Sequence, residues 1–262
     1  MSLQLADRVM ELVLGGYAIA VGTAILPMMS QHAAEKNLDE LKQTLTFSLR
    51  IVSFITVPAM VGLILLRQPI VQVLFQHGRF DESSTVLTAW ALWLYALGLP
   101  WFAATKILVP AFYSHQDTRT PVKVAALVMV ANVIFNLLFL RPLLNGGPAL
   151  ATSLAGVLNS VLLYSIFVRR YGDIGARDLA SALSRIAAAS ALMGLGTWGL
   201  LQWADFSSSQ PFWLRAGMLA AILAVSTALY FALAWLFRCE ELSDLYGIAR
   251  RQKKNTAPVP VA

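Results

Sequence analysis

The chain has 262 residues, of which 58% are hydrophobic and only 13% are charged. That charged share is roughly half the share found in ordinary soluble domains. A soluble fold of this length has too little interior to bury so much apolar surface. The composition therefore excludes a soluble domain and predicts an integral membrane protein. The single cysteine, Cys239, excludes an internal disulfide and any cysteine-based metal cluster.

Seven apolar segments of bilayer-spanning length recur along the chain. They are Val9–Met29, Phe47–Leu66, Thr85–Tyr113, Pro121–Leu140, Ala149–Val168, Ile186–Ala204 and Phe212–Phe237. Each is long enough to cross a hydrocarbon core of about 30 Å as a helix, and none shows the strict alternation of a β-barrel strand. We therefore expect an all-α fold with about seven transmembrane helices, in one polytopic domain with a basic cytoplasmic tail at 238–262.

Two connecting segments have the pattern of helices that lie on a membrane surface. Before the second apolar segment, charged residues surround an apolar stripe at helical spacing. The stripe consists of Ala34, Leu38, Leu41 and Leu45. After the last segment, Leu242, Leu245 and Ala249 repeat the pattern ahead of the basic cluster Arg250–Lys254. Anionic lipid headgroups would attract that cluster, although an ordinary solvated flank of a membrane helix is enough to explain it and is favoured.

Two apolar segments contain residues that shape a helix. Pro100 and Pro110 lie within the third segment and predict a kink with freed backbone carbonyls, as in a helix that lines a cavity. Small residues give the sixth segment a surface for close helix packing. These residues are Ala187, Ala191, Gly194 and Gly196.

The positive charges are distributed unequally between the two sets of connections. One set holds fourteen basic residues: Lys36, Lys42, Arg50, Arg119, Lys123, Arg169, Arg170, Arg177, Arg185, Arg238, Arg250, Arg251, Lys253 and Lys254. The opposite set holds four: Arg67, Arg79, Arg141 and Arg215. Because lysine and arginine gather in cytoplasmic loops, the C-terminus is expected in the cytoplasm and the N-terminus outside. Since the net charge of +6 is spread between apolar segments, it does not indicate nucleic-acid binding.

Ionisable residues open the first apolar segment. Arg8 and Glu11 are three residues apart, so they share one face of a helix and can form an ion pair. Charges at membrane depth are costly and usually face a cavity. An equally weighted alternative is that Asp7 caps the helix while Arg8 extends into the outer headgroup layer.

Three further polar positions lie inside apolar segments. Lys106 is close enough to the cytoplasmic end of its segment to extend to the membrane surface, which is favoured over a cavity position. Asn132 and Asn136 are one helical turn apart, and Asn159 lies in the next segment. Hydrogen bonding between helices is the favoured role for these amides, and the lining of a transport path is the alternative.

Two loops each combine a histidine with a carboxylate, which a membrane-interface enzyme would need. They are Phe75–Glu82 and Tyr113–Pro121. The chain shows no metal-ligand spacing, nucleophile elbow or phosphate-binding glycine loop. We therefore expect turn and capping roles, with Asp117 and Thr120 flanking a turn and Pro121 at the first position of a helix.

Five sequence motifs occur in an order that resembles one known family. They are Asp7–Glu11, Gly22–Pro27, Phe75–Phe80, Tyr95–Pro100 and Ala111–Val122, the last reading AFYSHQDTRTPV. Together they resemble the C-terminal half of the MurJ (MviN) family of lipid II flippases. The resemblance runs from about Leu5 to the last apolar segment.

The resemblance implies an alternating-access transporter of the bacterial inner membrane, related to multidrug and polysaccharide-lipid exporters, with fourteen helices in two lobes. Its substrate would be the lipid-linked peptidoglycan precursor. Arg8 and Glu11 match the arginine and glutamate of the family's central cationic cavity, which is thought to bind the pyrophosphate and sugars. Ile186–Ala204 and Phe212–Phe237 match the two helices that form a groove for the polyprenyl tail.

The resemblance leaves the seven helices of the N-terminal lobe without a counterpart in this chain. We therefore expect transport to need a separate N-terminal half, and no enzymatic activity or cofactor is expected. An ion gradient or the membrane potential could drive transport, but no ion site is evident. A cation-coupled exporter is the competing hypothesis within the superfamily, weakened by the lack of a carboxylate at mid-membrane. An interface enzyme and a non-transporting structural fragment are two further hypotheses.

Overall fold

The computed structural model describes residues 3–12, 14–15, 29, 31, 35, 37–76, 81–143, 146–204, 206 and 210–243. Residues 3–12 are helical, and seven longer helices follow in the described part of the chain. These are α2 (Leu38–Phe75), α3 (Glu82–Ala96), α4 (Leu99–Ser114), α5 (Arg119–Leu143), α6 (Gly147–Tyr171), α7 (Ala176–Trp203) and α8 (Phe212–Leu236). The described residues contain no strand, so the expected all-α fold is confirmed.

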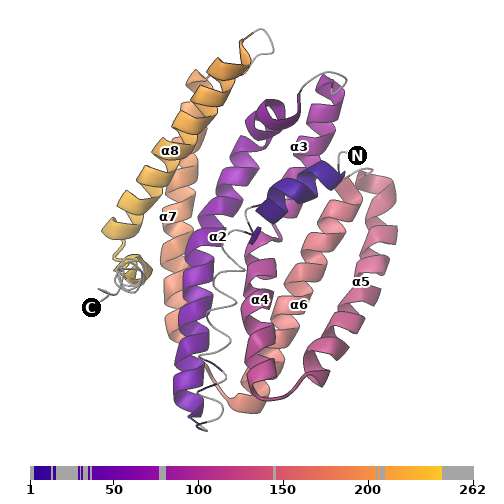
Figure 1. The fold of residues 1–262 in the computed structure, drawn as a ribbon, viewed down its shortest axis with the longest axis vertical. Helices are drawn as coiled ribbons and strands as arrows, with labels where there is room; N and C mark the ends of the chain where they lie inside the picture. Colours follow the sequence, from indigo (N-terminus) through magenta and orange to yellow (C-terminus); the bar gives the residue numbers. More distant parts are fainter. Residues whose placement is uncertain are drawn as a thin grey trace, which may run out of the picture.

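The long helices run side by side, up and down, along one axis of the molecule (Figure 1). The connections α2–α3, α5–α6 and α7–α8 lie at one end, which is also where the N-terminus lies. The connections α4–α5 and α6–α7 lie at the other end, and α8 runs toward that end but stops short of it. The helical stretch 3–12 crosses the bundle obliquely, and its residues Ala6, Val9 and Met10 are buried in the main hydrophobic core.

Within the described residues, five helices are long and apolar enough to cross a membrane: α2, α5, α6, α7 and α8. The pair α3 and α4 adds a sixth crossing if the two helices form one bent span, with an angle of 43° between them. The first expected span, Val9–Met29, lies largely outside the described residues. Its described residues 9–12, 14–15 and 29 are helical.

The surface helix expected at Ala34–Leu45 is wrong as a separate element. Leu38, Leu41 and Leu45 belong to α2, which continues without a break for 38 residues, or about 57 Å. Leu41 and Leu45 are fully buried, because their apolar stripe continues in register into the buried face of the following span. Asn37 caps the helix by accepting a hydrogen bond from the backbone N–H of Glu40 (3.3 Å). Ala34 lies outside the described residues.

The second expected surface helix can be followed only at its start. Residues 240–243 are helical, and Leu242 packs on a small core formed by α2, α7 and α8. Leu245, Ala249 and the basic cluster Arg250–Lys254 lie outside the described residues.

The kink expected in the third apolar segment is present at Leu97–Gly98, just before Pro100. Proline has no N–H to donate, so the helical hydrogen-bond ladder is interrupted there. At the same break the Gly98 N–H donates to the Tyr95 carbonyl, which leaves the Leu94 carbonyl without its helical donor. The hydroxyl of Ser153 on α6 donates to the carbonyls of Leu94 (2.7 Å) and Tyr95 (3.3 Å). Pro110 lies inside α4 without breaking it.

Two glycines let α7 pack closely on both neighbours. A Cβ atom on Gly194 would lie 2.8 Å from the Val61 side chain of α2, and one on Gly196 would lie 2.5 Å from Leu229 of α8. The expected close packing is therefore present at both glycines. Ala187 and Ala191 are exposed and do not contribute to it.

We predict that Gly194→Leu destabilises the protein by about 1–3 kcal/mol, because the new side chain would overlap Val61. Gly199→Leu is the matched control on the same helix, since a Cβ there meets open space. Thermal unfolding of the purified protein in detergent measures both effects. Equal stability of the two variants would show that α7 and α2 are not packed as closely as described.

Candidate lipid-binding site

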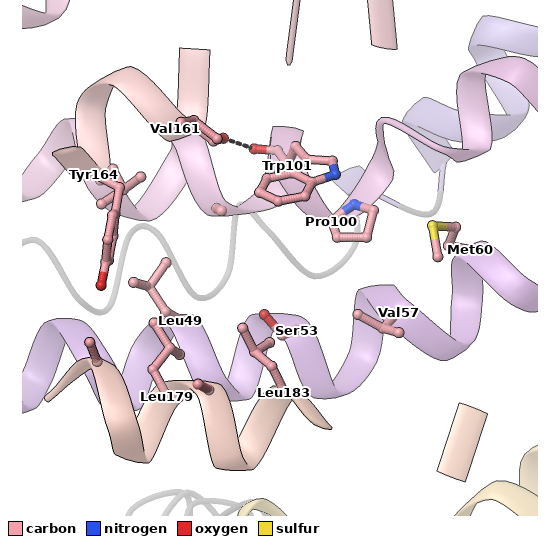
Figure 2. Close-up of a pocket in the computed structure, with 15 residues that line it drawn as sticks. Leu49, Ser53, Val57, Met60, Pro100, Trp101, Val161, Tyr164, Leu179 and Leu183 are labelled. Carbon is pink, nitrogen blue, oxygen red and sulfur yellow. Dashed lines mark hydrogen bonds between the residues drawn. The ribbon is translucent and has the colours of Figure 1, made fainter. Parts of the chain in front are cut away.

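An apolar cavity with a volume of about 470 Å³ lies between α2, α4, α6 and α7. In Figure 2, Leu49, Ser53 and Val57 of α2 lie beside Leu179 and Leu183 of α7, with Trp101 and Tyr164 across the cavity. The hydroxyl of Ser160 donates to the Trp101 carbonyl (2.5 Å) and lies 2.8 Å from the Thr105 hydroxyl. None of the described residues that line the cavity is charged, so it suits hydrocarbon and not a headgroup.

A second cavity of about 330 Å³ lies between α2 and α8, and we call it the α2–α8 groove. It is lined by Phe54, Ile55, Pro58, Ala59, Gly62, Leu63, Leu66 and Ile70 of α2, Met193 of α7, and Leu223, Ser226, Thr227, Tyr230 and Phe231 of α8. From Phe54 to Ile70 the groove follows about 24 Å of helix. A Cβ on Gly62 would meet no atom within 4 Å, which shows that this glycine faces open space.

The groove only partly matches the one implied by the resemblance. That groove was expected to be formed by the last two helices, α7 and α8. Most of the lining comes instead from α2, and α7 contributes Met193 alone among the described residues. The physical reason is the close contact of α7 with α2 at Gly194, which leaves little space on that side.

Charged side chains hold the segment just after α8 against α2. The Arg50 guanidinium donates from Nε to Glu241 (2.6 Å) and from a terminal nitrogen to Glu240 (2.8 Å). Glu241 is only 1% exposed. Hydrogen bonding from Arg50 and its positive charge lower the pKa of the Glu240 carboxyl below its ordinary value. This contact was not predicted from the sequence, because its members are about 190 residues apart.

The connection between α4 and α5 forms the expected structural turn. Asp117 accepts hydrogen bonds from the Thr120 backbone N–H (3.0 Å) and hydroxyl (2.6 Å), and from Arg170 of α6 (2.5 Å). These hydrogen bonds, with that of the Thr120 hydroxyl first, lower the pKa of the Asp117 carboxyl. Because α5 begins at Arg119, Pro121 is the third helical residue and not the first as expected. Its missing N–H costs nothing there, since the first four N–H groups of a helix have no acceptor within it.

His115 does not face a reaction site. Its ring stacks on Tyr171 with 4.2 Å between centroids, and its Nε2 is buried without a hydrogen-bond partner in the described part of the chain. Burial lowers the pKa of this imidazole. A neutral, stacked imidazole fits a packing role at this turn. The histidine and acidic residues that the structure describes form no cluster able to hold a metal ion.

Arg8 and Glu11 are both exposed, one turn apart on the N-terminal helical stretch. No ion pair joins the two side chains in the described part of the chain, although a pair was expected. The nearby Asp7 interacts electrostatically with both. The charged side chains of Arg8 and Glu11 are therefore accessible to any part of the protein or substrate that covers this surface.

The other expected polar residues are not brought together with Arg8. Lys106 is exposed and lines none of the described cavities. Asn136 donates to both the side-chain oxygen (2.7 Å) and the backbone carbonyl (2.9 Å) of Asn132. The expected hydrogen bonding between helices is thus wrong for this pair, since both bonds lie within α5. The side-chain oxygen of Asn159 is buried without a partner among the described residues.

Comparison with known proteins adds the family. The family described as "Lipid II flippase MurJ" matches residues 1–238. The chain belongs to the MurJ family. It is 36% identical to the probable lipid II flippase MurJ of Rhizobium meliloti (strain 1021) over 89% of this chain and 44% of the relative. It is 32% identical to the corresponding protein of Rhizobium tropici over 100% of this chain and 49% of the relative.

A solved structure of "Lipid II flippase MurJ, inward closed conformation" has the same fold as this chain. The TM-score is 0.65 at 25% identity, and the match covers 88% of this chain and 47% of that one. The chain spans about half the length of the curated relatives it matches. Its apolar helices and its family make it a multi-pass protein of the bacterial inner membrane.

We predict that Asp117→Ala lowers the free energy of unfolding by about 0.5–2 kcal/mol through loss of the cap. Asp117→Asn should cost less, because the amide oxygen can still accept the Thr120 bonds. Since the pKa of Asp117 is lowered by folding, its charge stabilises the protein above the ordinary pKa of about 4 and this contribution disappears below it. Thermal unfolding of the three proteins between acidic and neutral pH tests this. A wild-type advantage over Asp117→Asn that grows as the pH falls would contradict the assignment.

Proposed function

We propose that this chain is the C-terminal part of a transporter that moves the lipid-linked peptidoglycan precursor, lipid II, across the inner membrane. The family match over residues 1–238 carries this proposal. A flippase must shelter a charged headgroup from hydrocarbon while its hydrocarbon tail stays in an apolar environment. The chain offers separate surfaces for these two parts of such a substrate.

Arg8 and Glu11 are the proposed headgroup residues. Arg8 is exposed on a helical stretch whose other side is buried in the core, so its position is set while its guanidinium stays accessible. A guanidinium presents a planar set of donors that matches two phosphate oxygens at once. Glu11, one turn away, can orient it.

The α2–α8 groove is the proposed site for the hydrocarbon tail. Its lining is almost entirely apolar, and it extends along α2 for about 24 Å. Few hydroxyl groups in the groove are free to bind water, because the hydroxyl of Ser226 already accepts a hydrogen bond from that of Thr197 (2.8 Å). A long, narrow apolar channel open along its length fits one chain better than a compact ligand.

A second protein or segment supplies the rest of the transport path in this proposal. The curated relatives are about twice as long as this chain. Only 11% of the most apolar stretch of α5 is buried within the chain. Most of the surface of this helix can therefore contact lipid or another protein. No cofactor is included in the proposal, which leaves an ion gradient or the membrane potential as the energy source.

The proposed orientation places the α4–α5 connection and the end of α8 in the cytoplasm. Arg119, Lys123, Arg169 and Arg170 lie toward that end of the bundle, and the excess of basic residues supports this side as the inner one.

We predict that Arg8→Lys impairs transport although it keeps the charge. Losing one charge-assisted hydrogen bond to phosphate should cost about 1.5–3 kcal/mol, or about ten- to a hundredfold in binding. The test is growth of cells depleted of their own lipid II flippase, rescued by a full-length protein that includes this chain, at equal membrane levels. Arg8→Gln serves as the uncharged comparison, and Gln4→Lys as a control for added charge on the same helical stretch. Full rescue by Arg8→Gln would remove Arg8 from the substrate site.

We predict that a cysteine at position 118 is protected from an impermeant thiol reagent in intact cells, whereas one at position 83 is labelled. Thr118 and Ser83 are both exposed and lie at opposite ends of the bundle. Cys239→Ser provides the background, which is a small change at a buried site. The reverse labelling pattern would invert the proposed orientation.

A further inference from the structure

The α2–α8 groove is open along its length but blocked at one end. Its lining at that end consists of Phe54 on α2 and of Tyr230 and Phe231 on α8. The Phe54 and Tyr230 ring centroids are 5.1 Å apart, and Phe231 lies 6.3 Å from Phe54 and 5.9 Å from Tyr230. We call these three residues the aromatic stop.

A hydrogen bond fixes the stop across the two helices. The Tyr230 hydroxyl donates to the Phe54 carbonyl (2.7 Å), and both side chains are buried. Pro58, four residues on, has no N–H to donate to this carbonyl, so the Tyr230 hydroxyl replaces the missing helical bond and connects α8 to the backbone of α2. The residues just beyond the stop are packed against their neighbours, since Ile51 is 3% exposed and Ala234 is fully buried.

One turn of α2 beyond Phe54, the charged contact of Arg50 with Glu240 and Glu241 closes the same end. Because Glu241 is almost completely buried, losing Arg50 would leave an uncompensated charge inside the protein. The contact therefore strongly favours the position in which α8 lies against α2. Arg185 of α7 also donates to the Arg238 carbonyl just after α8 (3.3 Å), which holds the same segment from a third helix.

At the opposite end of α8, the buried Arg215 donates to the side chain of Gln76 (3.3 Å). The aromatic stop and the charged contact of Arg50 lie together at the other end of the groove.

From this closed end we infer that the aromatic stop sets the length of hydrocarbon chain that the groove accepts, and that the Arg50–Glu241 contact keeps the stop in place. The inference rests on the proposed function, in which the groove holds the lipid tail. A chain that enters between α2 and α8 lies along Gly62 and ends against Phe54 and Tyr230. Carbons beyond the stop must remain in the bilayer and add nothing to binding.

The test uses polyprenyl phosphates of increasing length as probes, with the full chain in lipid nanodiscs. In the wild type, affinity should rise with chain length and then level off. In Tyr230→Ala the plateau should move to longer chains, because the opened end lets further carbons make packing contacts with the protein. A photoreactive group on the last isoprene unit should label Phe54 or Phe231 in the wild type, and residues beyond the stop in the variant.

Matched variants separate the parts of the inference. Tyr230→Phe keeps the ring and should keep the plateau, while Arg50→Ala should shift it as Tyr230→Ala does. Phe231→Ala offers a second opening of the stop at a more exposed position, should Tyr230→Ala not fold. An unchanged plateau in every folded variant that opens the stop, or no plateau in the wild type, would overturn the inference.

Gly62→Phe tests whether the probe uses the groove at all, because the new ring would fill open space without a clash. Gly217→Phe is the control on α8, where a Cβ also meets open space but the residue does not line the groove. Loss of binding in Gly62→Phe alone supports the groove as the tail site. Unchanged binding in both would contradict the proposed tail site and, with it, the aromatic stop. A loss in Gly62→Phe with an unchanged plateau in the opened variants would contradict the stop only.

Discussion

A polar backbone atom in hydrocarbon must find its partner within the protein, because the surrounding lipid offers none and each unpaired group costs several kcal/mol. In this chain the requirement arises at the break between α3 and α4, where the Gly98 N–H donates to the Tyr95 carbonyl and leaves that of Leu94 without its helical donor. The hydroxyl of Ser153 donates to the Leu94 carbonyl, and this bond joins the α3–α4 pair to α6. The same solution recurs at Pro58, which has no N–H to donate to the Phe54 carbonyl; that carbonyl accepts from the Tyr230 hydroxyl of α8 instead.

Features of the fold that depend on residues close together in the sequence could be predicted, and the others could not. Apolar length predicted the helices, and Pro100 predicted the kink, because each effect acts within a few residues. The continuity of α2 through Leu41 and Leu45 was missed, since charges beside an apolar stripe are equally typical of a surface helix. Only the buried face of the following span, with which the stripe is in register, distinguishes the two cases.

In the candidate site too, contacts between residues close in the sequence could be predicted, and contacts between residues far apart could not. The turn at Asp117 could be predicted, because cap and acceptor are three residues apart. The contact of Arg50 with Glu241 could not, since nothing in either neighbourhood identifies the other residue. Glu240 and Glu241 did carry one usable signal, as an acidic pair just after an apolar span. Asn132 and Asn136 show the opposite error: an amide pair at helical spacing was read as bonding between helices, yet each is close enough to satisfy the other within α5.

The contacts at the closed end of the groove support one another. Pro58 has no N–H to donate to the Phe54 carbonyl, and the Tyr230 hydroxyl supplies the donor from α8. One turn earlier on α2, Arg50 pairs with the buried Glu241. Separating α8 from α2 there would leave an unpaired carbonyl and an unpaired carboxylate, so this end of the groove is costly to open.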